Sequence, residues 1–260
     1  MDRPIYFSAS GGSEPYHGLE KYLQSEGLAY RVVPKINPSG SAYNIPLRMD
    51  AIYDNLMNKF KFGGIKENPN IYLDENILRM ILNIRGSYSR LAETLLAKAA
   101  KEEAAGDLPA AKADRDKAAK VADRSITEFP SDRVPHVIYD YANTEVYYVA
   151  GQKEKARKLV NELMAGARNE LDYYKDVYEY MLNQAKESGD KNYQAQLEQG
   201  GMIERREVRD QLGLMQELSQ ITQKYDEPAF AQKIAQDFQT YQGAFIKVAP
   251  QQRRAPGQPK

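Results

Sequence analysis

The sequence predicts a mainly α-helical protein, in which a tetratricopeptide-like array of helical hairpins follows a small α+β cap at the N-terminus. After residue 74, apolar side chains recur every three or four positions, as they do on an amphipathic helix. Glycines interrupt this pattern at intervals, which is typical of helical hairpin repeats. Before residue 70, short segments rich in strand-forming residues lie between turns that contain proline or glycine.

These changes of pattern divide the chain into three expected parts. Residues 1–70 are predicted to form the small α+β segment, and residues 71–245 the helical repeat domain. Residues 246–260 are predicted to be a disordered tail, because the sequence from 250 onward has no large apolar side chain with which to fold.

Four short elements are predicted in the cap. Strands are expected at 4–8 and 28–33, where aromatic and β-branched residues gather. A helix of about two turns is expected at 19–26, ended by Gly27. A second helix is expected at 50–60, with Asp50 as its N-cap and Gly63-Gly64 after its end.

Six helices are predicted in the repeat domain. The first begins at Asp74 and continues to a break at Gly106, and Gly86 within it indicates close packing or a bend. The second, at 110–129, is rich in Ala, Lys and Asp and is expected to lie largely in water. The others are expected at 134–150, at 153–188 with a possible break at Gly166, at 203–225 and at 228–242.

One segment fits the tetratricopeptide pattern well. On its first helix, Thr144 is the small residue and Tyr147 the aromatic one, and Gly151 forms the turn. The small residue Ala156 and the apolar residues Val160 and Leu163 follow on its second helix. Small residues allow two helices to approach closely, and the aromatic ring fills the space beneath them. Asp140 and Asn143 depart from the pattern, because large apolar residues are usual at their positions. A generic antiparallel helical bundle is the alternative interpretation.

The composition excludes several classes of function. The 36 basic and 36 acidic side chains cancel, so no overall field draws the protein to nucleic acid or to an anionic membrane. No run approaches the roughly 20 apolar residues that a membrane-spanning helix needs, so direct membrane insertion is not expected.

Cysteine is absent, which rules out disulfides and thiolate metal sites. The first residues lack the order of a signal peptide, which indicates a cytoplasmic protein or part of a longer one.

No arrangement of residues typical of catalysis is found. His17 follows a glycine-containing loop that lacks the ending of a phosphate-binding loop, and His136 is expected to cap a helix or lie at the surface. Acids at helix starts, such as Asp74, are more often caps than general acids. We therefore expect a protein that is not an enzyme and has no cofactor and no metal site.

Tyrosines crowd residues 139–180, and they suggest a binding surface. Tyrosine at helical spacing is more often part of a core. In the tetratricopeptide register, however, Tyr141, Glu145 and Tyr148 face the concave side of the array, where a protein or peptide partner binds, while Tyr147 lies in the core. These three residues are the predicted protein-binding site.

Several segments of the sequence resemble a family of bacterial multi-pass membrane proteins of unknown function. The resemblance extends in order over residues 3–185, and its most specific segments are 3–7, 18–23, 26–34, 53–60, 63–64 and 71–76. Members of that family have a hydrophobic N-terminal portion similar to protein O-mannosyltransferase-like, C-type glycosyltransferases. A C-terminal region of tetratricopeptide character follows that portion.

The resemblance implies an accessory domain of a membrane-embedded glycosyltransferase-like protein, at the periplasmic face of the inner membrane. Such a domain would mediate protein contacts or position an acceptor polypeptide, and its partner would include its own membrane portion. The family's presumed catalytic acids lie in that portion and have no counterpart among these 260 residues. The chain itself is expected to be monomeric.

Two other functions remain open from the sequence. The chain could be a free-standing cytoplasmic helical-repeat scaffold, which the absence of a signal peptide favours. It could also be a glycan-capture protein built on helical repeats. Glycan-binding surfaces favour stacking aromatic residues, especially tryptophan, and the sequence has no tryptophan.

Overall fold

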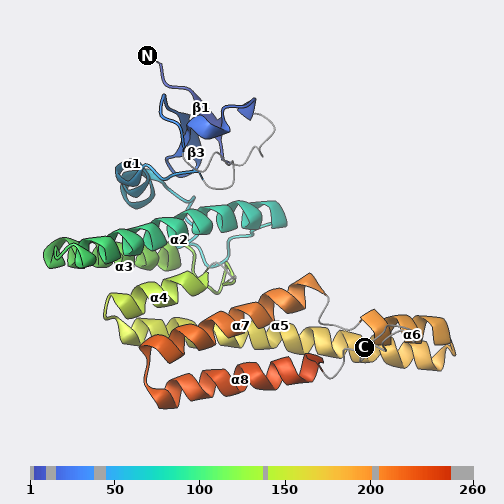
Figure 1. Ribbon diagram of the computed structural model, residues 1–260. Helices are drawn as coiled ribbons and strands as arrows, with labels where there is room; N and C mark the ends of the chain where they lie inside the picture. The colour runs from blue at the N-terminus through green and yellow to red at the C-terminus, as the bar shows by residue number, and fades with distance from the viewer. Residues whose placement is uncertain (1–2, 10–15, 38–44, 137–139, 201–204, 247–260) are drawn as a thin grey trace, which may run out of the picture. The chain divides into compact units, whose positions relative to one another are not determined.

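The computed structural model describes residues 3–9, 16–37, 45–136, 140–200 and 205–246, and the chain divides into two compact units (Figure 1). The first unit comprises Met1–Gln152 and the second Lys153–Lys260. The predicted fold class is confirmed, because the described chain is mainly helical, its helices pack as hairpins, and a small sheet lies near the N-terminus. The part boundaries predicted at residues 70 and 245 stay a prediction.

The sheet has three short antiparallel strands in the order β1-β3-β2. They are β1 (Tyr6–Ser8), β2 (Leu23–Ser25) and β3 (Ala29–Val32). In the register, Phe7 lies opposite Tyr30 and Gln24 opposite Arg31. The strands predicted at 4–8 and 28–33 are therefore confirmed as β1 and β3.

The prediction of a helix at 19–26 is wrong. A 3-10 turn, η2 (Glu20–Tyr22), leads into strand β2 at that place. Leu23 is completely buried in a cluster with Tyr16 and Ile45, and it pairs with β3 through its backbone. Because an isolated helix of two turns is marginal in water, these long-range contacts decide the local structure.

The helix predicted at 50–60 consists of two parts. They are α1 (Met49–Asp54) and a π-helical turn, η3 (Asn55–Lys59). Asp50 is not its N-cap, because the helix begins one residue earlier and Arg48 occupies the cap position. Asp50 instead lies in the first turn, where its negative charge interacts favourably with the helix dipole.

Helices α2 (Glu75–Ala104) and α3 (Leu108–Glu128) form a tight hairpin. Both begin at an aspartate cap, since Asp74 accepts a hydrogen bond from the Ile77 amide (2.8 Å) and Asp107 from the Ala110 amide (3.1 Å). The turn between them has a Schellman bonding pattern around Gly106, whose φ is 86°. The predicted start of the first helix at Asp74 and its break at Gly106 are confirmed, whereas the second helix begins two residues before the predicted residue 110.

Helix α3 does not lie largely in water, which corrects a prediction. One of its faces is buried against α2 and consists mainly of small residues: Ala111, Asp114, Ala118, Ala119, Val121, Ala122 and Ser125. Alanine side chains allow two helices to approach closely, so a helix with little hydrophobic mass can still pack over its whole length. The Lys98 ammonium, at 2.5 Å from Asp114 Oδ2, joins the two helices beside this face.

Helix α4 (Tyr141–Val149) begins later than the predicted residue 134, and residues 137–139 lie outside the described part of the chain. The buried side chain of Arg85 on α2 occupies the space before α4. Its Nη1 donates to Asp140 Oδ2 (3.1 Å) and to the Pro135 carbonyl (2.8 Å). Its Nη2 donates to the carbonyls of Phe129 (2.5 Å) and Val134 (3.0 Å).

Arg85 and Asp140 therefore form an ion pair in the interior of the first unit. Both side chains are only 1% exposed. Burial lowers the pKa of the Arg85 guanidinium, and the Asp140 carboxylate opposes that effect. His136 Nδ1 lies 3.1 Å from the same carboxylate oxygen. The pair explains why Asp140 departs from the tetratricopeptide pattern: it neutralises an arginine that α2 places in the core.

The second unit contains α5 (Lys153–Glu187), α6 (Lys191–Gly200), α7 (Arg206–Tyr225) and α8 (Pro228–Ile246). Helix α5 continues through Gly166 without a break, and α6 was not predicted from the sequence. Three polar contacts join α5 to α8 or to Asp226, two residues before it, and each spans 69 positions: Arg157 with Asp226, Arg168 with Asp237 and Asp172 with Tyr241. The constant offset shows that α5 and α8 run parallel (Figure 1).

The positions that fit the tetratricopeptide pattern lie in the interior. Gly151 follows α4 with a φ of 74°, and the amide of Gln152 donates to the Tyr147 carbonyl (2.8 Å), as in a Schellman turn. The remaining pattern residues are all buried: Thr144, Tyr147, Ala156, Val160 and Leu163. Residues 247–260, which include most of the predicted tail, lie outside the described part of the chain.

The buried ion pair predicts a large effect of a single substitution. Asp140→Ala should lower the free energy of unfolding by about 3–5 kcal/mol, because it leaves the Arg85 guanidinium buried without its counter-charge. Arg79→Ala, which removes a partner of Glu75 in an exposed pair, should cost less than about 1 kcal/mol. Urea unfolding followed by circular dichroism measures both, and equal losses would contradict this account of the interior.

Two glycines of the first unit should respond to alanine in opposite directions. Gly86 is helical and has open space where a Cβ would lie, so Gly86→Ala should raise the free energy of unfolding by about 0.5–1 kcal/mol. Gly151 has a positive φ, so Gly151→Ala should lower it by about 1–2 kcal/mol. Thermal unfolding of the two variants provides the comparison. A destabilised Gly86→Ala variant would show that close packing, and not helix propensity, governs that position.

Candidate protein-interaction surfaces

The predicted binding residues Tyr141, Glu145 and Tyr148 lie on one face of α4, since they are spaced by four and three positions. Tyr148 is only 8% exposed, whereas Tyr141 and Glu145 are half-buried. Glu145 lies close enough to Glu93 of α2 to help raise the pKa of that carboxyl, whose burial is the larger cause. The structure thus brings the three residues together, and their binding role stays a prediction.

Tyr147 lies in the core, as the tetratricopeptide register predicts. Its ring is buried, and its hydroxyl donates to Asp123 Oδ1 of α3 over 2.9 Å. Burial and the neighbouring Asp123 carboxylate strongly raise the pKa of this phenol. Tyr147 therefore acts as a packing residue that joins α3 to α4.

The N-terminal sheet has its own small core. Tyr16, Leu23 and Ile45 form this core, and Phe7, Tyr30 and Val32 pack against it. The Tyr16 ring makes edge-to-face contacts with Phe7 (5.5 Å between centroids) and Tyr30 (5.9 Å). Burial raises the pKa of the Tyr16 hydroxyl. The aromatic contacts hold β1 and β3 together on the covered side of the sheet.

Glu26 connects the sheet to the chain that follows it. Its carboxylate accepts hydrogen bonds from Arg48 Nη1 (2.7 Å) and from the Tyr6 hydroxyl (3.2 Å), and Arg31 Nη1 lies 3.6 Å away. The hydrogen bond to Glu26 is the largest cause of the raised pKa of Arg48. Glu26 therefore holds β1, β3 and the start of α1 in one arrangement.

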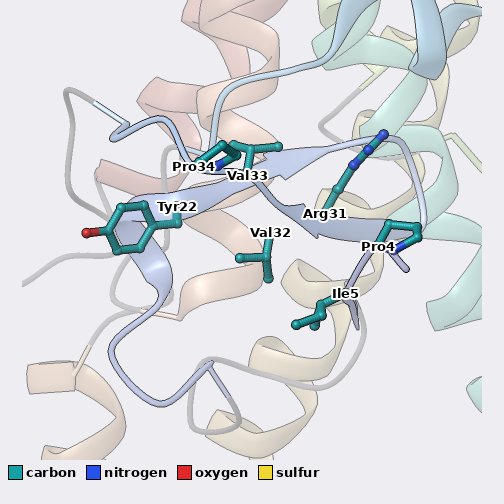
Figure 2. A pocket seen from close by; sticks show the side chains of 7 residues that line it. All are labelled: Pro4, Ile5, Tyr22, Arg31, Val32, Val33 and Pro34. Carbon is teal, nitrogen blue, oxygen red and sulfur yellow. The ribbon is translucent and has the colours of Figure 1, made fainter. Parts of the chain in front are cut away.

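An apolar hollow of about 470 Å³ lies at the end of this sheet (Figure 2). Its lining consists of Pro4, Ile5, Tyr22, Arg31, Val32, Val33 and Pro34. The Val32 amide donates to the Ile5 carbonyl (3.0 Å), so the ends of β1 and β3 are joined there. Ile5 is 52% exposed, and Arg31 is the one charged residue in the lining. The hollow can hold an apolar group, and its one charged lining residue, Arg31, also lies 3.6 Å from the Glu26 carboxylate.

This hollow could not be recognised as a site from the sequence. Its walls come from segments that are nearly 30 positions apart in the sequence, Pro4-Ile5 and Val32-Val33-Pro34. The available signal was an apolar residue next to a proline at the end of each strand, and that pattern is also typical of ordinary strand ends. Only the antiparallel pairing of β1 with β3 places the two segments side by side.

The two histidines lie apart and make different contacts. His17 is exposed in a turn with a φ of 49°, and His136 contacts the buried Asp140 carboxylate. Within the described ranges, no group of three or more His, Asp or Glu side chains is arranged to hold a metal ion. No helix in the described part of the chain is both long enough and apolar enough to cross a membrane.

The burial of Tyr148 leads to a prediction about the surface on α4. Tyr148→Ala should lower the free energy of unfolding by about 3–5 kcal/mol, because it removes a mostly buried ring from the packing of α4. Glu145→Gln should change it by less than about 1 kcal/mol, because that side chain is only half-buried. Chemical unfolding of both variants tests this, and a Tyr148→Ala variant of unchanged stability would contradict the packing role.

Comparison with known proteins relates one part of the chain to a family. Residues 1–50 match the family described as TMEM260-associated domain 2. No curated protein and no solved structure matches the chain. The matched residues contain all three strands, the whole lining of the hollow and the start of α1. The resemblance inferred from sequence is thus supported over residues 1–50, which are similar to a domain associated with TMEM260, and it stays a prediction over residues 51–185.

Proposed function

We propose that the chain is a non-catalytic interaction domain of a membrane-embedded glycosyltransferase-like protein, and that it mediates protein contacts or positions an acceptor polypeptide. One observation carries this proposal: the residues that match the TMEM260-associated domain are those that form the sheet with the apolar hollow. The proposed place of action is the periplasmic face of the inner membrane.

The chemistry of the sheet supports a protein as the partner. Ile5, Tyr6, Leu28 and Ile36 are exposed apolar or aromatic residues within a segment of 50 residues. Of these residues, Ile5 lines the hollow, where exposed apolar surface is typical of a protein contact. An apolar side chain of the partner would fill the hollow, and Arg31 would donate to a carbonyl or carboxylate beside it. The membrane portion of a TMEM260-type protein is the first partner to test.

The proposal assigns sugar transfer to the membrane portion and none to this chain. The described residues provide contacts and shape. Three of their carboxylates are almost fully buried in ion pairs: Asp226 with Arg157, Asp140 with Arg85 and Asp114 with Lys98. Such carboxylates stabilise the fold and are poorly placed to exchange protons with a substrate. Sugar transfer by the isolated chain, measured with labelled donors, would overturn this part of the proposal.

A co-purification experiment tests the contact. The chain and the membrane portion of a TMEM260-type protein from the same genome are produced as separate polypeptides and purified through a tag on the chain in mild detergent. The wild-type pair should co-purify, and Ile5→Asp should weaken the complex about ten- to a hundredfold, because it places a charge in an apolar contact. Circular dichroism confirms that the variant is folded.

Met80→Asp is the matched control, because Met80 is also an exposed apolar residue of the first unit but lies on α2, outside the lining of the hollow. It should leave co-purification unchanged. Absence of a complex with the wild-type chain, or equal weakening by the two variants, would contradict the proposed role of the sheet.

A further inference from the structure

Helix α5 carries a second exposed surface that differs chemically from the N-terminal hollow. Tyr173 and Tyr180 are 63% and 65% exposed, and Asp176 lies between them. Residues spaced by three and four positions share one face of a helix. The rise of about 1.5 Å per residue separates the two tyrosines by about 10 Å. We call Tyr173, Asp176 and Tyr180 the tyrosine face.

The tyrosine face lies away from the packed side of α5. Leu171, Tyr178 and Ala185 mark the packed side, because all three are buried. The Tyr178 hydroxyl donates to the Leu197 carbonyl of α6 over 3.1 Å. Tyr178 therefore has a structural role that accounts for its ring. Tyr173 contacts Tyr174 edge to face (5.4 Å), and that contact leaves most of its surface in water.

The charges that α5 itself places beside the two rings have one sign. Within the described residues, the Asp176 carboxylate makes no hydrogen bond and no ion pair. At 100° per residue, Lys175 and Lys186 project from the opposite side of the helix. Glu170 and Glu187 lie within about 60° of the Tyr173 direction. On α5, two exposed rings thus flank an unpaired carboxylate with no cation of the same helix on their side. Arg205, just before α7, interacts with the neighbouring Tyr174.

We propose that the tyrosine face binds a positively charged segment of a polypeptide partner. An arginine or lysine of that segment would pair with Asp176 and lie over the ring of Tyr173 or Tyr180, whose faces carry negative potential. Arginine suits this surface best, because its planar guanidinium can stack on a ring while it donates to a carboxylate. The inference concerns the second unit and goes beyond the proposed function, which rests on the N-terminal sheet.

The separation of the rings specifies the spacing of the cations. A peptide in the polyproline II conformation has three residues per turn and advances about 3.1 Å per residue, so residues i and i+3 lie on one side about 9 Å apart, close to the distance of about 10 Å between the tyrosines. A partner with arginines at every third position can therefore place one over each ring. A peptide of the same composition with its arginines adjacent can place only one.

Fluorescence anisotropy with the full chain tests the proposal. The probe is a labelled twelve-residue peptide of Gly, Ser and Arg with arginine at every third position. Tyr173→Ala combined with Tyr180→Ala should weaken its binding about five- to thirtyfold, since two exposed cation–π contacts are lost. The corresponding double Phe variant keeps both rings and should bind within about twofold of the wild type. Asp176→Asn should weaken binding and reduce its dependence on salt.

Control variants and peptides make the result specific. Tyr72→Ala removes an exposed tyrosine of the first unit and should not change binding, and neither should Ile5→Asp in the hollow. The peptide with adjacent arginines should bind more weakly than the probe. Unchanged binding by the double Ala variant, or equal binding of a peptide with glutamate in place of arginine, would overturn the proposal.

The chain's own C-terminal residues provide a final test. Residues 250–260 contain Arg253, Arg254 and Lys260 and no acidic residue. If a chain that ends at residue 249 binds the probe more tightly than the full chain, then these residues compete for the face, and the proposal of a separate partner is overturned. Equal binding by the two chains supports a separate partner.

Discussion

The contact between the Arg85 guanidinium and the Asp140 carboxylate determines how the helices of the first unit come together. An ionised group that is buried without a partner costs several kcal/mol, so an arginine can lie inside a protein only where acceptors surround it. The chain supplies them with a carboxylate before α4 and with carbonyls of the segment between α3 and α4. Because one side chain of α2 bonds to Phe129, Val134, Pro135 and Asp140, it holds the described residues that follow α3 and precede α4 against α2.

Arginines of α2, α3 and the segment after α3 also hold the N-terminal part of the first unit. Arg90 donates to the Ile45 carbonyl (2.8 Å), Arg124 to that of Met57 (2.7 Å) and Arg133 to that of Ile65 (2.9 Å). Charged donors make stronger hydrogen bonds than neutral ones, so these contacts stabilise residues 45–65, in which α1 and η3 are the only described helical elements and both are short. The sheet that matches the TMEM260-associated domain is thereby joined to the helices by donors on their surface, and the apolar end of the sheet is left for other contacts.

The helices could be predicted from the sequence because their signals are local. Asp74 and Asp107 cap helices through hydrogen bonds to amides three positions away, and the apolar stripe of α2 repeats within one segment. Strand β2 could not be predicted, because Leu23 becomes part of a strand only by pairing with β3. The sequence shows Asp140 only as a departure from the repeat pattern. Its role in the interior depends on Arg85, which lies 55 positions away in the sequence. The tyrosine face could not be predicted either, because the sequence alone does not distinguish the exposed Tyr173 and Tyr180 from the buried Tyr178.

The two proposed surfaces show how a chain of zero net charge can still select partners by charge. Ionic interactions in water are screened over about 8 Å at physiological salt. A partner therefore responds to the few charged groups that it contacts and not to the net charge of the chain. At the hollow these groups are apolar side chains and one arginine. At the tyrosine face they are two rings and a carboxylate. A partner with an apolar side chain beside an acidic or carbonyl group fits the first, and a cationic segment fits the second. Because the two surfaces lie on different units and favour opposite charges, one polypeptide segment does not satisfy both, and each surface can be altered while the other is left intact.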